Sequence, residues 1–215
     1  MAQIFPKWTN RIPLIIVIFV FIGLTSTVGF IWYYGSPKYT DVGYAPKQPI
    51  DYSHKLHAGE LGMDCRYCHT TVERSAVAGI PPTQTCMNCH TLVKAESEKL
   101  TVLLDSWATG KSIGWIRIHN LPNYAYFDHS AHLSAGIGCE SCHGKITEME
   151  VVQLTEPLSM SWCLDCHRKP GKHIRPQDQL TVMNRLPPSN QMQFAKALIT
   201  EKKITPPTDC SGCHR

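Results

Sequence analysis

The sequence predicts one N-terminal transmembrane helix followed by a domain of loops and short helices with little or no β-sheet. Three observations carry this prediction. The segment from Pro13 to Tyr34 is apolar and contains no charged residue. After it, the motif C-x-x-C-H occurs five times and uses all 10 cysteines of the 215-residue chain. Proline and glycine are frequent in this second region, and both residues interrupt regular structure.

The cysteine motifs indicate covalent haem. C-x-x-C-H is the attachment signature of c-type cytochromes, in which two thiols add to the haem vinyl groups and the histidine becomes the proximal iron ligand. A disulfide framework needs no histidine after each second cysteine, a zinc site needs paired motifs rather than five, and a thioredoxin-like redox pair needs one copy. The sequence therefore predicts a multihaem cytochrome c domain that carries five covalent haem c groups.

The residues of these motifs follow directly. The predicted thioether cysteines are Cys65, Cys68, Cys86, Cys89, Cys139, Cys142, Cys163, Cys166, Cys210 and Cys213. The predicted proximal ligands are His69, His90, His143, His167 and His214. No catalytic residue is predicted.

Composition agrees with a domain built around cofactors. Only 9% of the residues are aromatic, so the haem macrocycles are expected to supply much of the apolar core. The formal net charge is +4. Two propionates on each haem would bring the holoprotein to about −6, so a basic surface for nucleic acid is not predicted.

The N-terminal segment is predicted to anchor the chain in a lipid bilayer. Residues 1–12 carry Lys7 and Arg11 and are expected in the cytoplasm, and residues 13–34 span about 33 Å as a helix. A cleaved signal peptide is the competing interpretation, but the apolar run is long and no A-x-A-like cleavage site follows it. The haem domain is then expected on the periplasmic side of the inner membrane, where haem is attached to cytochromes c.

The predicted helix has no ionisable side chain, so by itself it is not expected to handle quinol protons. Gly23, Ser26 and Gly29 recur every three residues and either allow close approach of another helix or are ordinary small residues of a lone anchor. Residues 35–50 are rich in proline and polar residues and are predicted to be an extended linker, with the pentahaem domain at 51–215.

An internal repeat organises the haem domain. Residues 52–90 and 127–167 each contain an aromatic residue, an H-x-x-H pair, a glycine-bearing spacer and two C-x-x-C-H motifs. The first motif begins eight residues after the H-x-x-H pair in one unit and seven in the other. The simplest description is two dihaem units plus a fifth haem at 210–214. Helices are predicted at 92–107, at 191–202 and at the haem motifs.

Six histidines remain for the distal side of five irons. His54 and His129 are expected to serve the haems of their own motifs, and His57 and His132 neighbouring haems, because histidines three residues apart on a helical turn are offset along one face. His119 is the fifth predicted distal ligand. The alternatives, should one of these fail, are His173, Met160, Met149 and Met183.

Three runs resemble one known family. They are GYAPKQPIDYSHKLHAGELGMDCRYCH from Gly43, RIHNLPNYAYFDHSAHLSAGIGCESCHGKI from Arg117, and EPLSMSWCLDCHR from Glu156. Together with the N-terminal helix they resemble the membrane-anchored pentahaem cytochrome c subunit of alternative complex III, a bacterial quinol:electron-acceptor oxidoreductase.

The resemblance implies an electron-transfer subunit of a respiratory or photosynthetic complex. Its implied partners are an iron-sulfur subunit, polytopic quinol-binding subunits, and a monohaem cytochrome c or an oxidase that accepts the electrons. By itself the subunit would not be an enzyme.

Two other function classes fit the sequence less well. A multihaem enzyme of the nitrite or hydroxylamine type needs an iron with an open site, often marked by C-x-x-C-K, whereas all five motifs here end in histidine. A stand-alone membrane-anchored quinol dehydrogenase should hold its first haem at the membrane, but 30 residues separate Tyr34 from Cys65. The quinol dehydrogenase remains the alternative prediction.

Overall fold

The structure is a computed structural model that describes residues 4–214. These residues separate into two units, the first ending at Val42 and the second beginning at Gly43. The boundary falls inside the predicted linker.

The first unit is helical. Helix η1 (Lys7–Arg11) leads into α1 (Ile12–Tyr34), and a short α2 (Pro37–Thr40) follows. Pro13 near the start of α1 is compatible with a helix because the first amide groups have no intrahelical partner. The predicted apolar helix is confirmed. Its mean hydropathy of 2.7 and its length make it the one helix in the described residues that could cross a membrane, and none of its side chains is buried.

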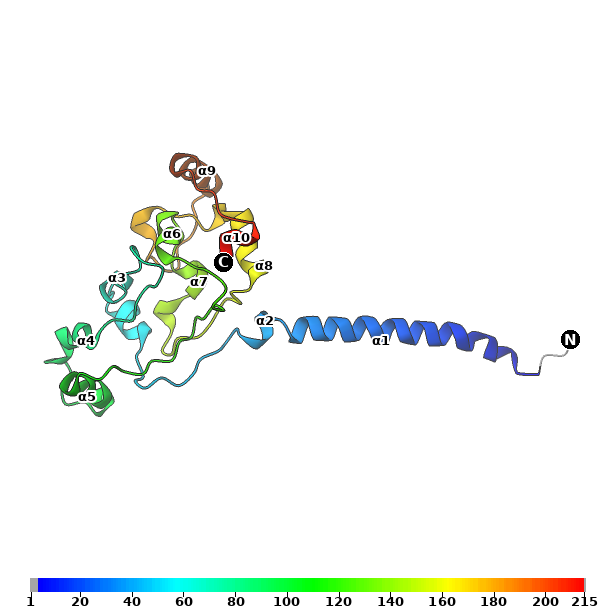
Figure 1. Ribbon diagram of the computed structural model, residues 1–215, viewed down its shortest axis with the longest axis horizontal. Helices are drawn as coiled ribbons and strands as arrows, with labels where there is room; N and C mark the ends of the chain where they lie inside the picture. Colours follow the sequence, from blue (N-terminus) through cyan, green and yellow to red (C-terminus); the bar gives the residue numbers. More distant parts are fainter. Residues whose placement is uncertain (1–3, 215) are drawn as a thin grey trace. The chain divides into compact units, whose positions relative to one another are not determined.

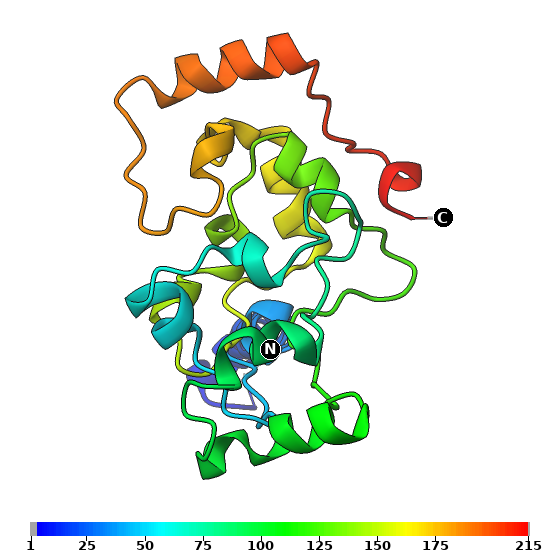
Figure 2. The same ribbon diagram turned by 90° about the vertical axis from the view of Figure 1, so that its left-hand side faces the viewer.

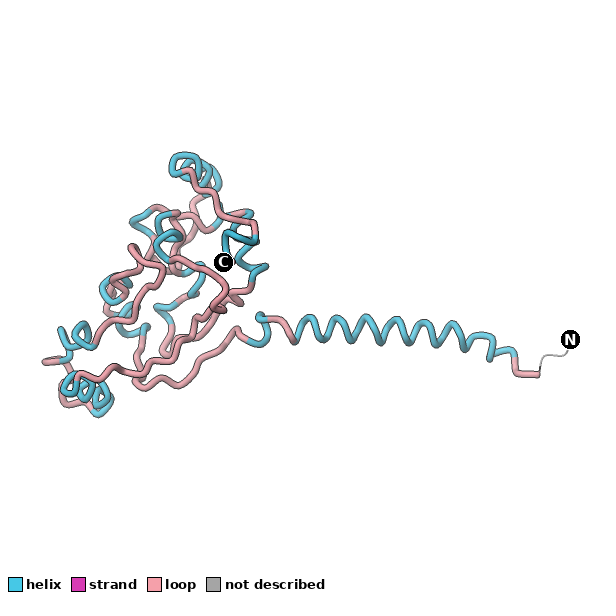
Figure 3. The backbone as a smooth tube through the Cα atoms, viewed as in Figure 1, coloured by secondary structure: helices cyan, strands magenta, loops and turns pink. Residues whose placement is uncertain are grey.

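The second unit consists of short helices separated by long loops, as Figures 2 and 3 show. The described residues contain no strand, and pairing is limited to the isolated bridges Ala125↔His214 and Ile137↔Ile174. The helical elements in order are η2 (Lys55–Glu60), α3 (Cys65–Cys68), α4 (Thr83–His90), η3 (Glu98–Leu100), α5 (Thr101–Thr109), α6 (His129–Ser134), α7 (Glu140–His143), η4 (Ile146–Glu148), α8 (Met160–Arg168), η5 (Pro170–Lys172), η6 (Gln177–Gln179), α9 (Gln191–Lys202) and α10 (Cys210–Cys213).

The two longer predicted helices have different outcomes. The prediction for 191–202 matches α9. The prediction for 92–107 began too early, because the residues after α4 form turns and Lys94 has a left-handed backbone with φ of 54°. The helix proper is α5, which ends at Gly110 in the left-handed conformation that commonly terminates helices.

Among the described residues, six of the nine buried apolar side chains form two small clusters. Val72, Leu133 and Leu180 make the first cluster. The second contains Ile137, Ile174 and Ala195, with partly buried residues of α9 against it. Such clusters are small for a domain of this length, which agrees with the prediction that haem supplies much of the core.

A glycine in each spacer gives the two repeats the same backbone turn. Gly62 and Gly136 lie three residues before the first cysteine of their units and have φ of +66° and +86°. At Gly136 a Cβ atom would also lie 2.8 Å from the Arg175 carbonyl oxygen. Positive φ is easily adopted only by glycine, so both positions favour this residue.

An ion pair joins the haem motif at Cys139–His143 to the loop that follows η5. The guanidinium of Arg175 donates to a Glu140 carboxylate oxygen at 2.8 Å and to the Val182 carbonyl at 2.7 Å. The Arg175 and Glu140 side chains are only 10% and 18% exposed. The Asn184 amide donates to the other Glu140 oxygen at 3.1 Å.

We expect Arg175→Met to lower the free energy of unfolding by about 3 kcal/mol, because a partly buried carboxylate loses its counterion. Denaturant unfolding of the holoprotein, followed by the Soret band, measures the change. The control Lys196→Met alters an exposed lysine on α9 and should change stability by less than about 0.5 kcal/mol. Equal effects of the two substitutions would contradict the role assigned to Arg175.

Candidate haem-binding sites

All five C-x-x-C-H motifs form short helices. We number the sites haem 1 to haem 5 in the order of their motifs, which lie on α3, α4, α7, α8 and α10. Capping side chains start three of these helices. Asp64 accepts from the Arg66 amide, Ser159 from the Trp162 amide and Asp209 from the Gly212 amide. An oxygen side chain before the first turn satisfies amides that otherwise lack partners.

Three histidine pairs have the spacing of two rings on one iron. An imidazole nitrogen lies about 2 Å from a bound first-row metal and the ring centroid about 1.1 Å farther, so two rings on one ion are separated by about 6.2 Å. The centroids of His57 and His90 are 6.2 Å apart. Those of His129 and His143 are 6.3 Å apart, and those of His132 and His167 are 6.1 Å apart.

Backbone carbonyls orient most of these rings. In seven of the motif and H-x-x-H histidines the Nδ1 atom donates to a main-chain oxygen, which leaves Nε2 with its lone pair free for iron. The bonds are His57 to Ser53 (2.9 Å), His69 to Gly79 (2.7 Å), His90 to Val93 (3.0 Å), His129 to Ala76 (2.8 Å), His132 to Asp128 (2.7 Å), His167 to Pro207 (2.6 Å) and His214 to Tyr124 (3.1 Å).

One aromatic side chain in each repeat positions the H-x-x-H pair. Tyr52 stacks on His57 at 4.5 Å and meets His54 edge-on at 4.8 Å. Phe127 repeats both contacts with His132 and His129, at 4.5 Å and 4.7 Å. The sequence shows an aromatic residue two positions before the first histidine in both repeats, but these ring contacts are visible only in the structure.

The most buried histidine is His143, where burial lowers the pKa to about 3. Burial also lowers the pKa of His54 to about 4, and electrostatic repulsion from His69 lowers this pKa further. Both imidazoles are therefore neutral at physiological pH, which is the form that binds metal. The electrostatic effect of His69 places His54 within range of this proximal histidine of the first motif.

His119 lies beside His143, with ring centroids 4.3 Å apart. That separation is too short for both rings to bind the same iron. The Nε2 atom of His119 is buried and has no hydrogen-bond partner within the described chain, as expected of a nitrogen that awaits a ligand.

The fifth site differs from the other four. In the part of the chain that the structure describes, the ring contact of His214 is with Tyr124, at 5.8 Å, and not with a histidine. The alternative ligands do not resolve it. His173 is half-buried after η5, Met149 and Met183 are half-buried, and Met160 is 68% exposed at the start of α8.

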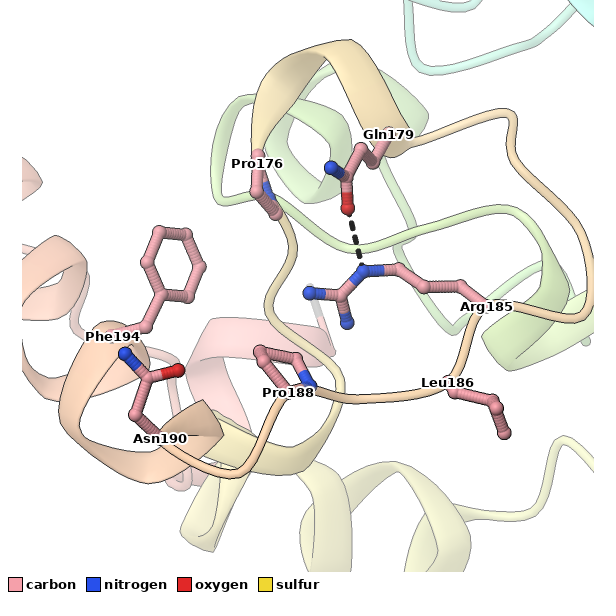
Figure 4. A pocket seen from close by; sticks show the side chains of 7 residues that line it. All are labelled: Pro176, Gln179, Arg185, Leu186, Pro188, Asn190 and Phe194. Atoms are coloured by element: carbon pink, nitrogen blue, oxygen red, sulfur yellow. Dashed lines mark hydrogen bonds between the residues drawn. The ribbon is translucent and has the colours of Figure 1, made fainter.

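The residues present therefore fit haem. Pairs of imidazole rings near the cysteine motifs have the spacing of two ligands on one iron, and the buried Nε2 of His119 lacks a hydrogen-bond partner within the described chain. A surface depression between η6 and α9, shown in Figure 4, contains none of these groups. Its lining includes Gln179, Arg185 and Phe194, and Arg185 donates to Gln179 at 2.7 Å.

The buried histidines predict a loss of stability in acid. The pKa values of His54 and His143 are lowered on folding, so the unfolded chain binds more protons below its histidine pKa of about 6.5. This contribution is complete above about pH 6.5 and is lost as the pH falls through the folded values of about 4 and about 3. Denaturant unfolding of the holoprotein at pH 7, 6, 5 and 4 measures it. A constant free energy of unfolding over this range would contradict the prediction.

Comparison with known proteins agrees with this geometry. Residues 36–113 match the class III cytochrome C family, and residues 125–215 match cytochrome c7 and related cytochrome c. The first match contains one predicted dihaem unit, and the second contains the other unit and the fifth motif.

A relative extends the comparison. Over 136 residues the chain is 32% identical to the multiheme cytochrome c subunit of menaquinone reductase from Nitratidesulfovibrio vulgaris. The match covers 62% of this chain, which spans only about 61% of that relative's length. The comparisons do not single out alternative complex III. The chain is a multihaem c-type cytochrome with class III-like and c7-like parts, and it binds five haems covalently.

Proposed function

We propose that this chain is the electron-relay subunit of a membrane complex that exchanges electrons with the quinone pool. One observation supports the proposal most directly: the chain combines a unit that contains five haem sites with a separate apolar helix that has no buried side chain. Bound haem c supplies one-electron exchange, and the protein positions the haems and orients their ligands.

The ligand assignment is part of this proposal. Haem 1 would be held by His69 and His54, haem 2 by His90 and His57, haem 3 by His143 and His129, and haem 4 by His167 and His132. The ring spacings near 6.2 Å support the pairs at haems 2, 3 and 4. The nearness of His54 to His69 supports the pair at haem 1. His214 would be the proximal ligand of haem 5. His119 remains a candidate distal ligand because its buried Nε2 has no hydrogen-bond partner within the described chain, but its ring lies beside that of His143, so we do not assign it to haem 5.

Quinone chemistry would occur in partner subunits. Quinone reduction takes up protons, and quinol oxidation releases them. Helix α1 has no carboxylate or histidine that could transfer these protons. A helix with only exposed side chains suits insertion in the inner membrane beside polytopic subunits, with the haem domain on the periplasmic side.

Two directions of electron flow fit these observations. The resemblance to alternative complex III favours quinol oxidation, with electrons passing through an iron-sulfur subunit and these haems to a monohaem cytochrome c or an oxidase. The relative's name supports the opposite direction, from haems to menaquinone. We favour quinol oxidation because the resemblance covers nearly the whole chain, including the N-terminal helix, whereas the match to the relative covers 62% of the chain.

We expect the protein, extracted from membranes in mild detergent, to co-purify with iron-sulfur and polytopic subunits. Menaquinol should reduce the haems of this complex rapidly. Menaquinol should not reduce the same chain after it is separated from its partners. Efficient reduction of the separated chain would instead support the stand-alone quinol dehydrogenase. If the reduced haems of the complex pass electrons to menaquinone but menaquinol does not reduce them, the proposed direction of electron flow is wrong.

We expect His132→Ala to convert haem 4 to the high-spin form and to leave haem 3 low-spin, because the proposed pair is His132 and His167. His129→Ala is the matched control and should convert haem 3 instead. Electron paramagnetic resonance measures the spin state of each haem. Damage confined to haem 3 in His132→Ala would show that the assignment is wrong.

A further inference from the structure

We propose that the five haems form a single file in the order 2, 1, 3, 4, 5, which differs from the order of their motifs in the sequence. Haems 2 and 5 are then the two ends of the file, where electrons arrive and leave. The order rests on contacts within residues 43–214. The role of the ends rests additionally on the proposed function.

Haem 2 adjoins haem 1. His54 immediately precedes η2, and His57 lies one turn later within it. The His57 ring is 6.2 Å from that of His90 of haem 2, and His54 is within electrostatic range of His69 of haem 1. A side-chain hydrogen bond also joins the two motif helices, because Asn88 on α4 donates to the Tyr67 hydroxyl on α3 at 3.1 Å.

Haem 1 adjoins haem 3, although 69 residues separate their motifs. Leu180 and Thr181 bridge the two. The Cys139 amide donates to the Leu180 carbonyl at 3.0 Å, and the Thr181 hydroxyl donates to the Asp64 cap of α3 at 2.8 Å. The thiols of Cys65 and Cys139 are themselves within hydrogen-bonding distance. In the holoprotein these sulfur atoms are the thioethers that attach haems 1 and 3.

Haem 3 adjoins haem 4 through one helix. Helix α6 carries His129, which faces His143, and one turn later His132, which faces His167. Haem 4 in turn adjoins haem 5, because the His167 ring donates to the carbonyl of Pro207, three residues before Cys210. Cys163 and Cys213 are also close enough to interact electrostatically.

Exposure gives independent support. All ten cysteines lie in the described residues, and only Cys89 of haem 2 and Cys210 of haem 5 are exposed. The other eight are half-buried. Figure 1 places α4 and α10, which carry these two cysteines, in separate parts of the haem domain. Exposed attachment sites at the two ends are expected of a file whose ends meet other redox proteins.

Removing single haems tests the order. In Cys65→Ala/Cys68→Ala, haem 2 loses its neighbour. Electron paramagnetic resonance of the purified complex should then show one magnetically isolated haem among the four that remain. In the matched variant Cys86→Ala/Cys89→Ala, an end of the file is removed, and none of the four should be isolated. If the haems instead followed the order of their motifs, removing haem 2 would isolate haem 1, and removing haem 1 would isolate none. That result would overturn the proposal.

A second pair of variants covers the case in which haem removal prevents folding. His57→Met and His54→Met keep every thioether and should change the potential of haem 2 or haem 1 alone. The first substitution should shift the titration of one neighbouring haem and the second that of two. Two shifted neighbours in His57→Met would contradict the order. These readouts require no quinone, so the order can hold where the proposed function fails, and the function can hold where the order fails.

Discussion

In residues 43–214 six of the nine buried apolar side chains form two small clusters of three. A domain of this length normally needs a larger apolar core to offset the conformational entropy lost on folding. Five macrocycles can supply that surface. Their covalent attachment also ties segments far apart in the sequence to rigid groups, so long loops do not prevent a defined structure.

Because iron binds only a neutral nitrogen with a free lone pair, the backbone must hold each imidazole in one tautomer. Seven rings achieve this by donating Nδ1–H to a main-chain carbonyl. Burial acts in the same direction at His54 and His143 by lowering their pKa values. The same burial makes these histidines a source of acid sensitivity.

The two repeats share the same local contacts around their histidine pairs. In each unit an aromatic ring braces a pair of histidines one turn apart, and a glycine with positive φ returns the chain toward the first cysteine. Under the proposed ligand assignment, one short helical segment would serve two irons and set the spacing between them. The link between the units is of a different kind, since it depends on Leu180 and Thr181 from a distant loop.

The sequence by itself determined the apolar helix, the five haem attachment sites, the two repeated units and the helix at 191–202, because these features depend on local spacing and on the chemistry of single residue types. The pairings of His57 with His90 and of His132 with His167, and the contact of Cys65 with Cys139, were decided only by the tertiary structure. Loops with little regular structure connect these residues. A loop sequence has no periodicity from which one could predict which distant residues it brings into contact. The start of α5 was misplaced for a related reason: Lys94 adopts a backbone conformation that its residue type does not announce.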